Sequence, residues 1–355
     1  MIALNTALSA ADLVAALKAA AEPTRLRILM LLSQGELSVK DLTVVLGQSQ
    51  PRISRHLKLL ADAGLIERFR DGSWAYFHVS ERTEGGRLAR SLVAAVDPLD
   101  NAIGRDGVRA QALKRDRAAA AQDYFRDHAR EWDRIRALYV AEGDVESAML
   151  DAMGQGPFGL FLDLGTGTGR ILELFAGRYA RAVGLDVNQS MLAYARNKLS
   201  AAGLETAQVR HGDLYTLALQ DGSVDAIVMH QVLHYLTEPA HAVREAARVL
   251  APGGRLLIGD FAPHDVEALR EVQAHTRLGI SNEHVAQWFA DAGLNMVLHR
   301  DLQPASGDRE QKLTVSLWIG EQPQRSGEQP QRSGQQTSEQ QPAPRRARSQ
   351  YERTP

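Results

Sequence analysis

The chain has 355 residues, more than one hydrophobic core usually supports, so two domains are the starting expectation. Its net charge of −2 argues against a polycationic nucleic-acid coat but is compatible with a local basic patch. The absence of cysteine excludes disulfides, thiolate metal sites and cysteine nucleophiles. Because no apolar run reaches membrane-spanning length, we expect a cytoplasmic protein without a membrane partner.

Composition and pattern divide the chain into four zones and predict a multidomain protein. Residues 1–97 combine short helical patterns with one hairpin signal, and residues 98–158 are predicted as a helical connector and lid. Residues 159–320 alternate β-branched runs with helical stretches, which is typical of a parallel α/β sheet. Residues 321–355 are rich in Gln, Pro, Ser and Arg and repeat the heptad EQPQRSG, so we expect a disordered tail.

The segment 41–79, DLTVVLGQSQPRISRHLKLLADAGLIERFRDGSWAYFHV, has the order of a mainly helical winged helix-turn-helix domain. In its second predicted helix Ile53, Leu57 and Leu60 recur at the helical period and should face a core. A hairpin with an Asp71-Gly72 turn should form the wing.

Polar and basic side chains occupy the opposite row of that second helix, where they can reach bases and phosphates in a major groove. The predicted DNA contacts are Gln50, Arg52, Ser54, Arg55 and Lys58 on the helix, and Arg68 and Arg70 on the wing. Residues 40–70 hold six Lys or Arg against three Asp or Glu, a local basic excess in a nearly neutral chain. The alternative is a solvated basic helix on an unrelated small domain.

The stretches EPTRLRILMLL (22–32), ELSVKDL (36–42) and SRHLKLLADAGLI (54–66) resemble the ArsR/SmtB family of bacterial repressors. The resemblance covers residues 10–97 and implies a homodimer, paired through helices near 11–21 and 87–97, on double-stranded operator DNA.

Metal-sensing members of that family read ELCVCDL, whereas Ser38 and Lys40 stand at the two cysteine positions here. Residues 1–100 contain only two histidines, His56 and His78, and a structural zinc site needs about four ligands. We therefore expect no metal, and we interpret Ser38 with Asp41 as a capping box that begins a helix.

The segment FLDLGTGTGRILELF (161–175) is a predicted strand that runs through a glycine-rich turn into a helix. The stretch 181–188 is a second predicted strand that ends in Asp186, where a carboxylate can hold ribose hydroxyls, and the stretch 209–215 ends a third strand in Asp213. The turn reads G-x-G-x-G, whereas a dinucleotide site reads G-x-G-x-x-G. A generic NAD-type Rossmann domain remains the alternative.

This set resembles the class I S-adenosylmethionine-dependent methyltransferases over residues 120–320, in particular the ubiquinone/menaquinone-biosynthesis type. The resemblance implies a Rossmann-like sheet that binds S-adenosylmethionine or S-adenosylhomocysteine. The implied cofactor-binding residues are Asp163, Gly165, Thr166, Gly167, Gly169, Asp186, Val187, Asp213, Leu214 and His230.

Catalysis by methyl transfer requires alignment and exclusion of water more than acid–base groups. The candidate bases are His230, His234 and Tyr235, although the last two could simply pack at a strand end. A candidate acceptor or effector pocket is formed by His264, Glu267, Arg270, His275 and Arg277, with a solvated helix face as the alternative. The helix expected over 125–139 presents aromatic side chains as a packed lid.

The two resemblances together imply a transcriptional regulator, acting as a repressor, whose methyltransferase-fold domain senses S-adenosylmethionine or S-adenosylhomocysteine. Genes of methionine and methyl-cycle metabolism would be natural targets. The alternative is an active methyltransferase for a small molecule with an accessory winged helix. A nucleic-acid methyltransferase is a third hypothesis, against which the HQVL sequence (230–233) counts, because it lacks an (N/D)PP(Y/F) motif.

Overall fold

The computed structural model describes residues 7–71, 74–80, 83–97, 100–137, 142–304 and 313–324, without the side chains of residues 70, 71, 136 and 137. The described residues up to Pro323 belong to one compact unit. The tail predicted as disordered lies, from residue 325 onward, outside the described residues. Glu321, the first residue of that predicted tail, instead closes the last strand.

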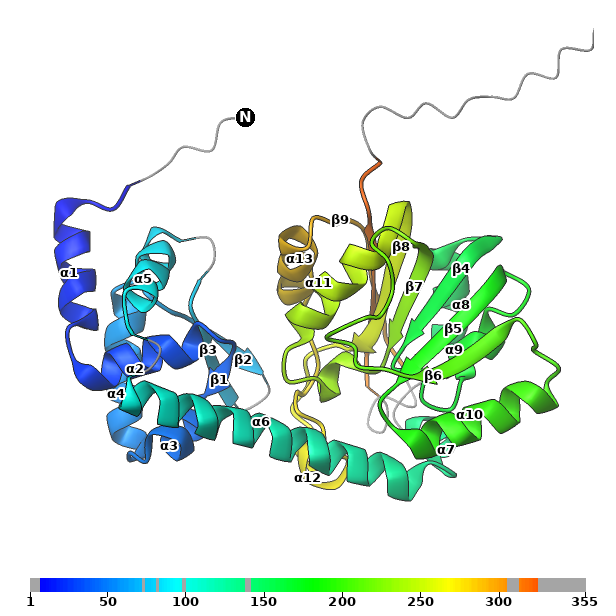
Figure 1. The fold of residues 1–355 in the computed structure, drawn as a ribbon, viewed down its shortest axis with the longest axis horizontal. Coiled ribbons are helices and arrows are strands. Elements are labelled where there is room, and N and C mark those ends of the chain that lie inside the picture. The colour runs from blue at the N-terminus through cyan, green and yellow to red at the C-terminus, as the bar shows by residue number, and fades with distance from the viewer. Residues whose placement is uncertain are drawn as a thin grey trace, which may run out of the picture. The chain divides into compact units, whose positions relative to one another are not determined.

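The N-terminal part is a winged helix, which confirms this half of the predicted fold (Figure 1). Its helices are α1 (Ala10–Ala20), α2 (Pro23–Leu32), α3 (Val39–Leu46), α4 (Gln50–Asp62) and α5 (Glu84–Ala94). The strands β1 (Leu37–Ser38), β2 (Glu67–Asp71) and β3 (Trp74–His78) form an antiparallel sheet in the order β1-β3-β2. Ile53, Leu57 and Leu60 of α4 are buried in the core, as their spacing predicts.

Local signals in the sequence explain where the helices of this domain begin and end. Ser38 Oγ accepts from the Asp41 amide at 3.2 Å and Asp41 accepts from the Ser38 amide at 3.0 Å, which confirms the capping box of α3. Gly47 ends α3 in the left-handed region, with φ of 64°. The hairpin differs from its prediction: Asp71 pairs with Trp74, so its loop lies at 72–73, one residue later than expected and outside the described residues.

The connector contains α6 (Asn101–His128), α7 (Trp132–Ala137) and α8 (Glu142–Met153). The helix expected over 125–139 is wrong as a single element, because α6 ends at His128 and a separate α7 follows. The 28 residues of α6 are far longer than an average helix of about 11–12 residues. This length allows one helix to contact both the winged helix, at α2 and α3, and α10 of the part that follows.

The C-terminal part is a seven-stranded sheet in the order β6-β5-β4-β7-β8-β10-β9, which confirms the predicted Rossmann-like methyltransferase fold (Figure 1). Its strands are β4 (Phe158–Leu164), β5 (Tyr179–Asp186), β6 (Ala207–His211), β7 (Val224–His230), β8 (Leu250–Phe261), β9 (Asn295–Leu302) and β10 (Val315–Glu321). The first five run parallel, and β10 pairs antiparallel with β8 and β9.

Helices cover both faces of this sheet, as buried parallel strands require. They are α8 of the connector, α9 (Arg170–Leu174), α10 (Gln189–Ala201), α11 (Pro239–Val249) and α13 (Asn282–Asp291), while the short α12 (Ala268–Val272) follows β8. Alternation along β4 shows the two layers: Phe161 packs in a core with α8, α9 and α10, whereas Leu162 packs in a core with α11 and α13. The loops after β4, β5 and β7 therefore meet at the carboxyl edge of a rigid sheet.

Candidate functional site

A cavity of about 370 Å³ opens at the carboxyl ends of the parallel strands β4, β5 and β7. Ligand sites in open α/β sheets form at this edge, and the volume falls within the usual range of about 300–1,000 Å³. Eight of the ten predicted cofactor-binding residues line it: Gly165, Thr166, Gly167, Asp186, Val187, Asp213, Leu214 and His230. Asp163 and Gly169 do not.

The glycine turn is fixed by hydrogen bonds to the neighbouring strand and by close packing. The amides of Gly165 and Thr166 donate to the Leu185 carbonyl at 2.9 and 3.0 Å. Gly165 has φ of 78°, and a Cβ there would lie 2.4 Å from Val232 Cγ2, so only glycine fits. Asp163 is buried beneath the turn, where it accepts from Thr166 Oγ1 at 2.6 Å. Asp163 thus supports the turn instead of facing the cavity.

Asp186 is the charged group that ends β5 at the cavity. Its carboxylate accepts from the Gly167 amide at 2.9 Å and from the Asn188 amide at 2.8 Å. Burial raises the pKa of Asp186 above the ordinary aspartate value, although these amides act in the opposite direction. Asp213 accepts from the Tyr215 amide at 2.9 Å and is exposed. Two carboxylates on neighbouring loops are therefore preorganised to receive hydroxyl or amino donors.

The end of β7 contributes His230, Gln231 and Tyr235 to the cavity wall. Gln231 has φ of 52°, a rare conformation for a side chain of this kind, and its buried Nε2 has no hydrogen-bond partner among the described residues. Burial raises the pKa of Tyr235 well above its ordinary value, which keeps the phenol protonated. His234, the remaining candidate base, lies behind Tyr235 and does not line the cavity.

The connector covers the cavity, a feature that the sequence indicated only through aromatic spacing. Ala118, Ala121, Gln122 and Phe125 of α6 line it, together with Trp132 of α7. The Asn188 side chain donates to the Gln122 carbonyl and to Gln122 Oε1, both at 3.0 Å, which anchors α6 over the loop after β5. The α6 residues include no glycine or carboxylate of the kind that indicates a binding site, so the sequence does not predict them as site residues.

The predicted acceptor-pocket residues lie elsewhere. None of His264, Glu267, Arg270, His275 and Arg277 lines this cavity. They do not share one helical face, because α12 spans only Ala268–Val272 and the His264 ring accepts from the Val266 amide before it. Arg270 instead lies over the Trp74 ring of the wing, 4.6 Å from its centroid.

His275 belongs to a buried aromatic cluster behind the cavity. Its ring centroid lies 4.2 Å from that of His234, whose Nδ1 lies 2.6 Å from an Asp260 oxygen. Burial lowers the pKa of His264 to about 4, with contributions from His234 and Arg270, and burial also lowers the pKa of His275. Both rings are therefore neutral in the folded protein at pH 7.

These histidines predict a loss of stability in mild acid. Unfolded histidine binds a proton near pH 6.5, whereas folded His264 does so only near pH 4, so protons favour unfolding between those values. We expect the free energy of unfolding, measured in urea, to fall as pH decreases from 6.5 to 4. Replacing both residues, His264→Gln with His275→Gln, should make this decline shallower; an unchanged slope would contradict the assignment.

The second candidate surface is the exposed face of α4. Gln50, Arg52, Ser54, Arg55 and Lys58 are all exposed, as is Arg68 of β2. The side chain of Arg70 lies outside the described part of the chain. Arg52 and Arg55 stand on the face opposite the buried Ile53 and Leu57, so α4 presents donors to solvent while its other face holds the core.

Two negative findings apply to the part of the chain that the structure describes. No group of three or more His, Asp or Glu side chains is arranged to hold a metal ion. No helix there has the length and apolar character needed to cross a bilayer.

Family models match two separate segments of this chain. Residues 22–68 match the bacterial regulatory proteins of the arsR family, and residues 162–258 match a methyltransferase domain. An uncharacterised transposon protein of Streptomyces fradiae is 36% identical over 163 residues, covering 42% of this chain and 47% of that protein.

Two methyltransferases also match. The uncharacterised methyltransferase YcgJ of Bacillus subtilis is 30% identical over 148 residues, 40% of this chain and 58% of its own. A demethylmenaquinone methyltransferase of Clavibacter sepedonicus is 35% identical over 158 residues, 44% of this chain and 62% of its own. The chain spans about half the length of the curated relatives it matches.

Proposed function

From a chain that joins an arsR-family DNA-binding segment to a methyltransferase domain, we propose a transcriptional regulator that responds to S-adenosylmethionine or S-adenosylhomocysteine. The observation that carries the proposal is that one compact unit combines an exposed basic recognition helix with a preformed nucleoside-sized cavity. The regulator acts as a repressor that binds operator DNA through α4 and the wing. Methionine and methyl-cycle genes are its proposed targets.

The cavity has the chemistry that this ligand requires. Asp186 supplies a half-buried carboxylate for the ribose hydroxyls, and exposed Asp213 one for the adenine amino group. The glycine turn allows close approach of the methionine part, and Trp132 lies 3.7 Å from where a Gly167 Cβ would stand. A Gln231 amide without a partner among the described residues offers a further donor.

A homodimer is part of the proposal. Helix α1 exposes three apolar side chains at helical spacing, Leu13, Val14 and Leu17, at 38, 49 and 42% of their accessible area. Pairing these faces around a two-fold axis would bury them and present two recognition helices to an inverted repeat.

The second candidate function is methyl transfer to a small molecule. The resemblance to methyltransferases and the aromatic wall of Phe125, Trp132 and Tyr235 favour it. In such a reaction the acceptor atom bonds the methyl carbon while the carbon–sulfur bond breaks, so the sulfonium becomes a thioether and the acceptor releases a proton. Transfer of labelled methyl to an extract fraction, absent with Asp186→Ala protein, would support this function.

Identification of the bound ligand is the first test. Mass spectrometry of the small molecule that co-purifies with the protein should detect S-adenosylmethionine or S-adenosylhomocysteine. Operator sequences can then be selected from a random DNA pool, and their affinity compared with and without that molecule. Operator-binding curves that coincide with and without the molecule would exclude the sensor function, whether or not the protein transfers methyl groups.

Asp186 provides the variant that tests the ligand site. Asp186→Ala removes a charged hydrogen-bond acceptor for the ribose, and we expect ligand affinity to fall on the order of 100-fold by calorimetry. Asp221→Ala, which removes a 78% exposed carboxylate, should leave affinity unchanged. Equal affinities of the two variants would contradict the assignment of Asp186.

A further inference from the structure

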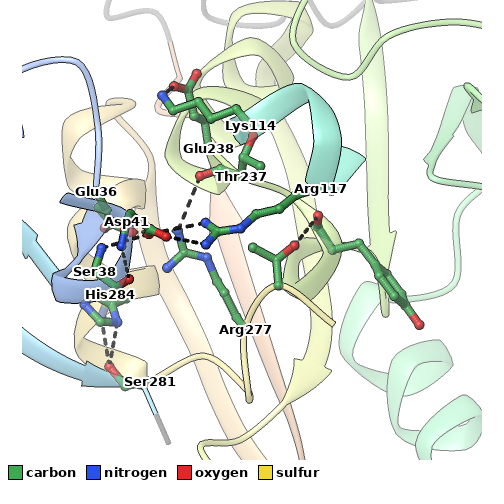
Figure 2. A network of polar contacts seen from close by, with 12 residues as sticks. Glu36, Ser38, Asp41, Lys114, Arg117, Thr237, Glu238, Arg277, Ser281 and His284 are labelled. Carbon is green, nitrogen blue, oxygen red and sulfur yellow. Dashed lines mark hydrogen bonds and ion pairs between the residues drawn. The ribbon is translucent and has the colours of Figure 1, made fainter. Parts of the chain in front are cut away.

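Residues 36–42, ELSVKDL, are held at both ends by arginines: one belongs to α6, which lines the ligand cavity, and the other follows α12 and bonds a turn that lines it. Arg117 of α6 makes an ion pair with Asp41, and Arg277 donates to Glu36 Oε2 at 2.6 Å (Figure 2). Both acceptors belong to the DNA-binding domain, at the start of α3. The contacts therefore join the segment before the recognition helix to the methyltransferase domain.

The first connection runs along a single helix. Arg117 directly precedes Ala118, which lines the cavity, and Gln122 and Phe125 line it further along α6. On its N-terminal side the same helix holds the winged helix through Asp106, which makes a paired hydrogen bond with Arg27 at 2.6 and 2.7 Å. Because an α-helix moves as a rigid rod over a few turns, displacement of the Gln122 region moves Arg117.

The second connection passes through the end of β7. Arg277 also reaches the Thr237 carbonyl at 3.5 Å, and its own amide donates to the His234 carbonyl at 3.0 Å. Tyr235 and Thr237, in the same turn, line the cavity. A ligand that contacts Tyr235 or Thr237 therefore moves the turn to which Arg277 is hydrogen-bonded.

Both ion pairs are largely shielded from water, so they are favourable only when donor and acceptor are correctly placed. The Asp41 side chain is 1% exposed and that of Arg277 is 6% exposed. Burial raises the pKa of Glu36, but Arg277, His284 and His78 together outweigh it and hold the pKa below the ordinary glutamate value. Glu36 is therefore charged at neutral pH, and separating either pair would leave a desolvated carboxylate.

We propose that segment 36–42 is where the DNA-binding domain senses whether the cavity is occupied, through Arg117–Asp41 and Arg277–Glu36. Asp41 caps α3, which packs against α4, so a shift at Asp41 changes the pose of the recognition helix. The ligand must bind one arrangement of these contacts better than the other. This inference rests on the proposed function and names the contacts that regulate it.

The test compares Arg117→Ala with Arg115→Ala, a matched loss of charge at an exposed position on the same helix. Fluorescence anisotropy gives the Kd for a selected operator at fixed salt, without ligand and with S-adenosylmethionine or S-adenosylhomocysteine. In wild type and Arg115→Ala, one ligand should change this Kd on the order of tenfold. In Arg117→Ala the change should fall below about twofold, while calorimetric ligand affinity without DNA stays within about threefold of wild type.

Reciprocity supplies an internal control, because operator DNA must change ligand affinity by the same factor, on the order of tenfold in wild type and below about twofold in Arg117→Ala. If Arg117→Ala unfolds, Asp41→Asn replaces it, since an amide oxygen can still cap α3 while the ion pair is lost. If ligand changes the operator Kd of the variant as much as that of wild type, the proposed coupling is overturned and the proposed function is not. A wild-type protein whose operator affinity ignores both ligands would overturn the proposed function and the coupling with it.

Discussion

Replacing Gly165 with alanine is expected to lower the free energy of unfolding by about 2–5 kcal/mol and to abolish ligand binding. The left-handed backbone, with φ of 78°, costs a side chain about 1–2 kcal/mol. The added Cβ would also lie 2.4 Å from Val232 Cγ2, and overpacking of this kind costs about 1–3 kcal/mol. Relief of the clash requires the turn or Val232 to move, and both form the cavity wall.

Gly177→Ala is the matched control for this substitution. Gly177 has a similar φ of 83°, but no atom lies within 4 Å of the Cβ that alanine would add. Its cost should be limited to about 1–2 kcal/mol from the backbone, with ligand affinity unchanged. Urea unfolding and calorimetry of both variants give the comparison. Equal destabilisation by the two alanines would show that the Gly165–Val232 contact is unimportant.

Replacing Asp260 with alanine is expected to destabilise the methyltransferase domain by about 3–5 kcal/mol. The Asp260 carboxylate is fully buried and bonds His234 Nδ1 at 2.6 Å and the Leu233 and Phe261 amides at 3.0 and 2.8 Å. Its removal leaves these buried donors without an acceptor, which costs more than the bonds themselves contributed. Ligand affinity should fall as well, because the released turn carries Tyr235 of the cavity wall.

Asp221→Ala tests whether the destabilisation expected for Asp260→Ala comes from burial of the carboxylate or from loss of an ion pair. Asp221 is likewise paired with a basic side chain, that of Arg248, but the Asp221 side chain is 78% exposed. An exposed pair contributes about 0–1 kcal/mol, so the two aspartate variants should differ several-fold in urea unfolding. A comparable loss of stability in Asp260→Ala and Asp221→Ala would contradict the claim that burial of Asp260 sets the cost.

Much of the fold follows from local signals in the sequence. The capping box at Ser38, the core spacing of Ile53, Leu57 and Leu60, and the glycine turn after β4 each specify structure within a few residues. The end of α6 at His128 was missed, because the aromatic residues at 125 and 132 share a helical period across the break. The interval from His264 to Arg270 likewise fits a helix, but a side-chain bond to the Val266 backbone competes with it.

The candidate site was predictable where a residue type carries the chemistry. The glycine turn after β4 and the carboxylates after β5 and β6 are of this kind, and Gly165, Gly167, Asp186 and Asp213 line the cavity. The covering residues of α6 are alanines and a glutamine, which have no such signature. The ion pairs Arg117–Asp41 and Arg277–Glu36 join residues 76 and 241 positions apart, and only the tertiary structure brings them together.

The most direct measurement of the central claim is operator affinity as a function of ligand, for wild type and Asp186→Ala side by side. Anisotropy titrations of a selected operator at one salt concentration should give wild-type curves that separate on the order of tenfold when S-adenosylmethionine or S-adenosylhomocysteine is added. The Asp186→Ala curves should coincide at the same ligand concentrations. Wild-type curves that coincide with both ligands and with neither would contradict the claim that the cavity regulates DNA binding.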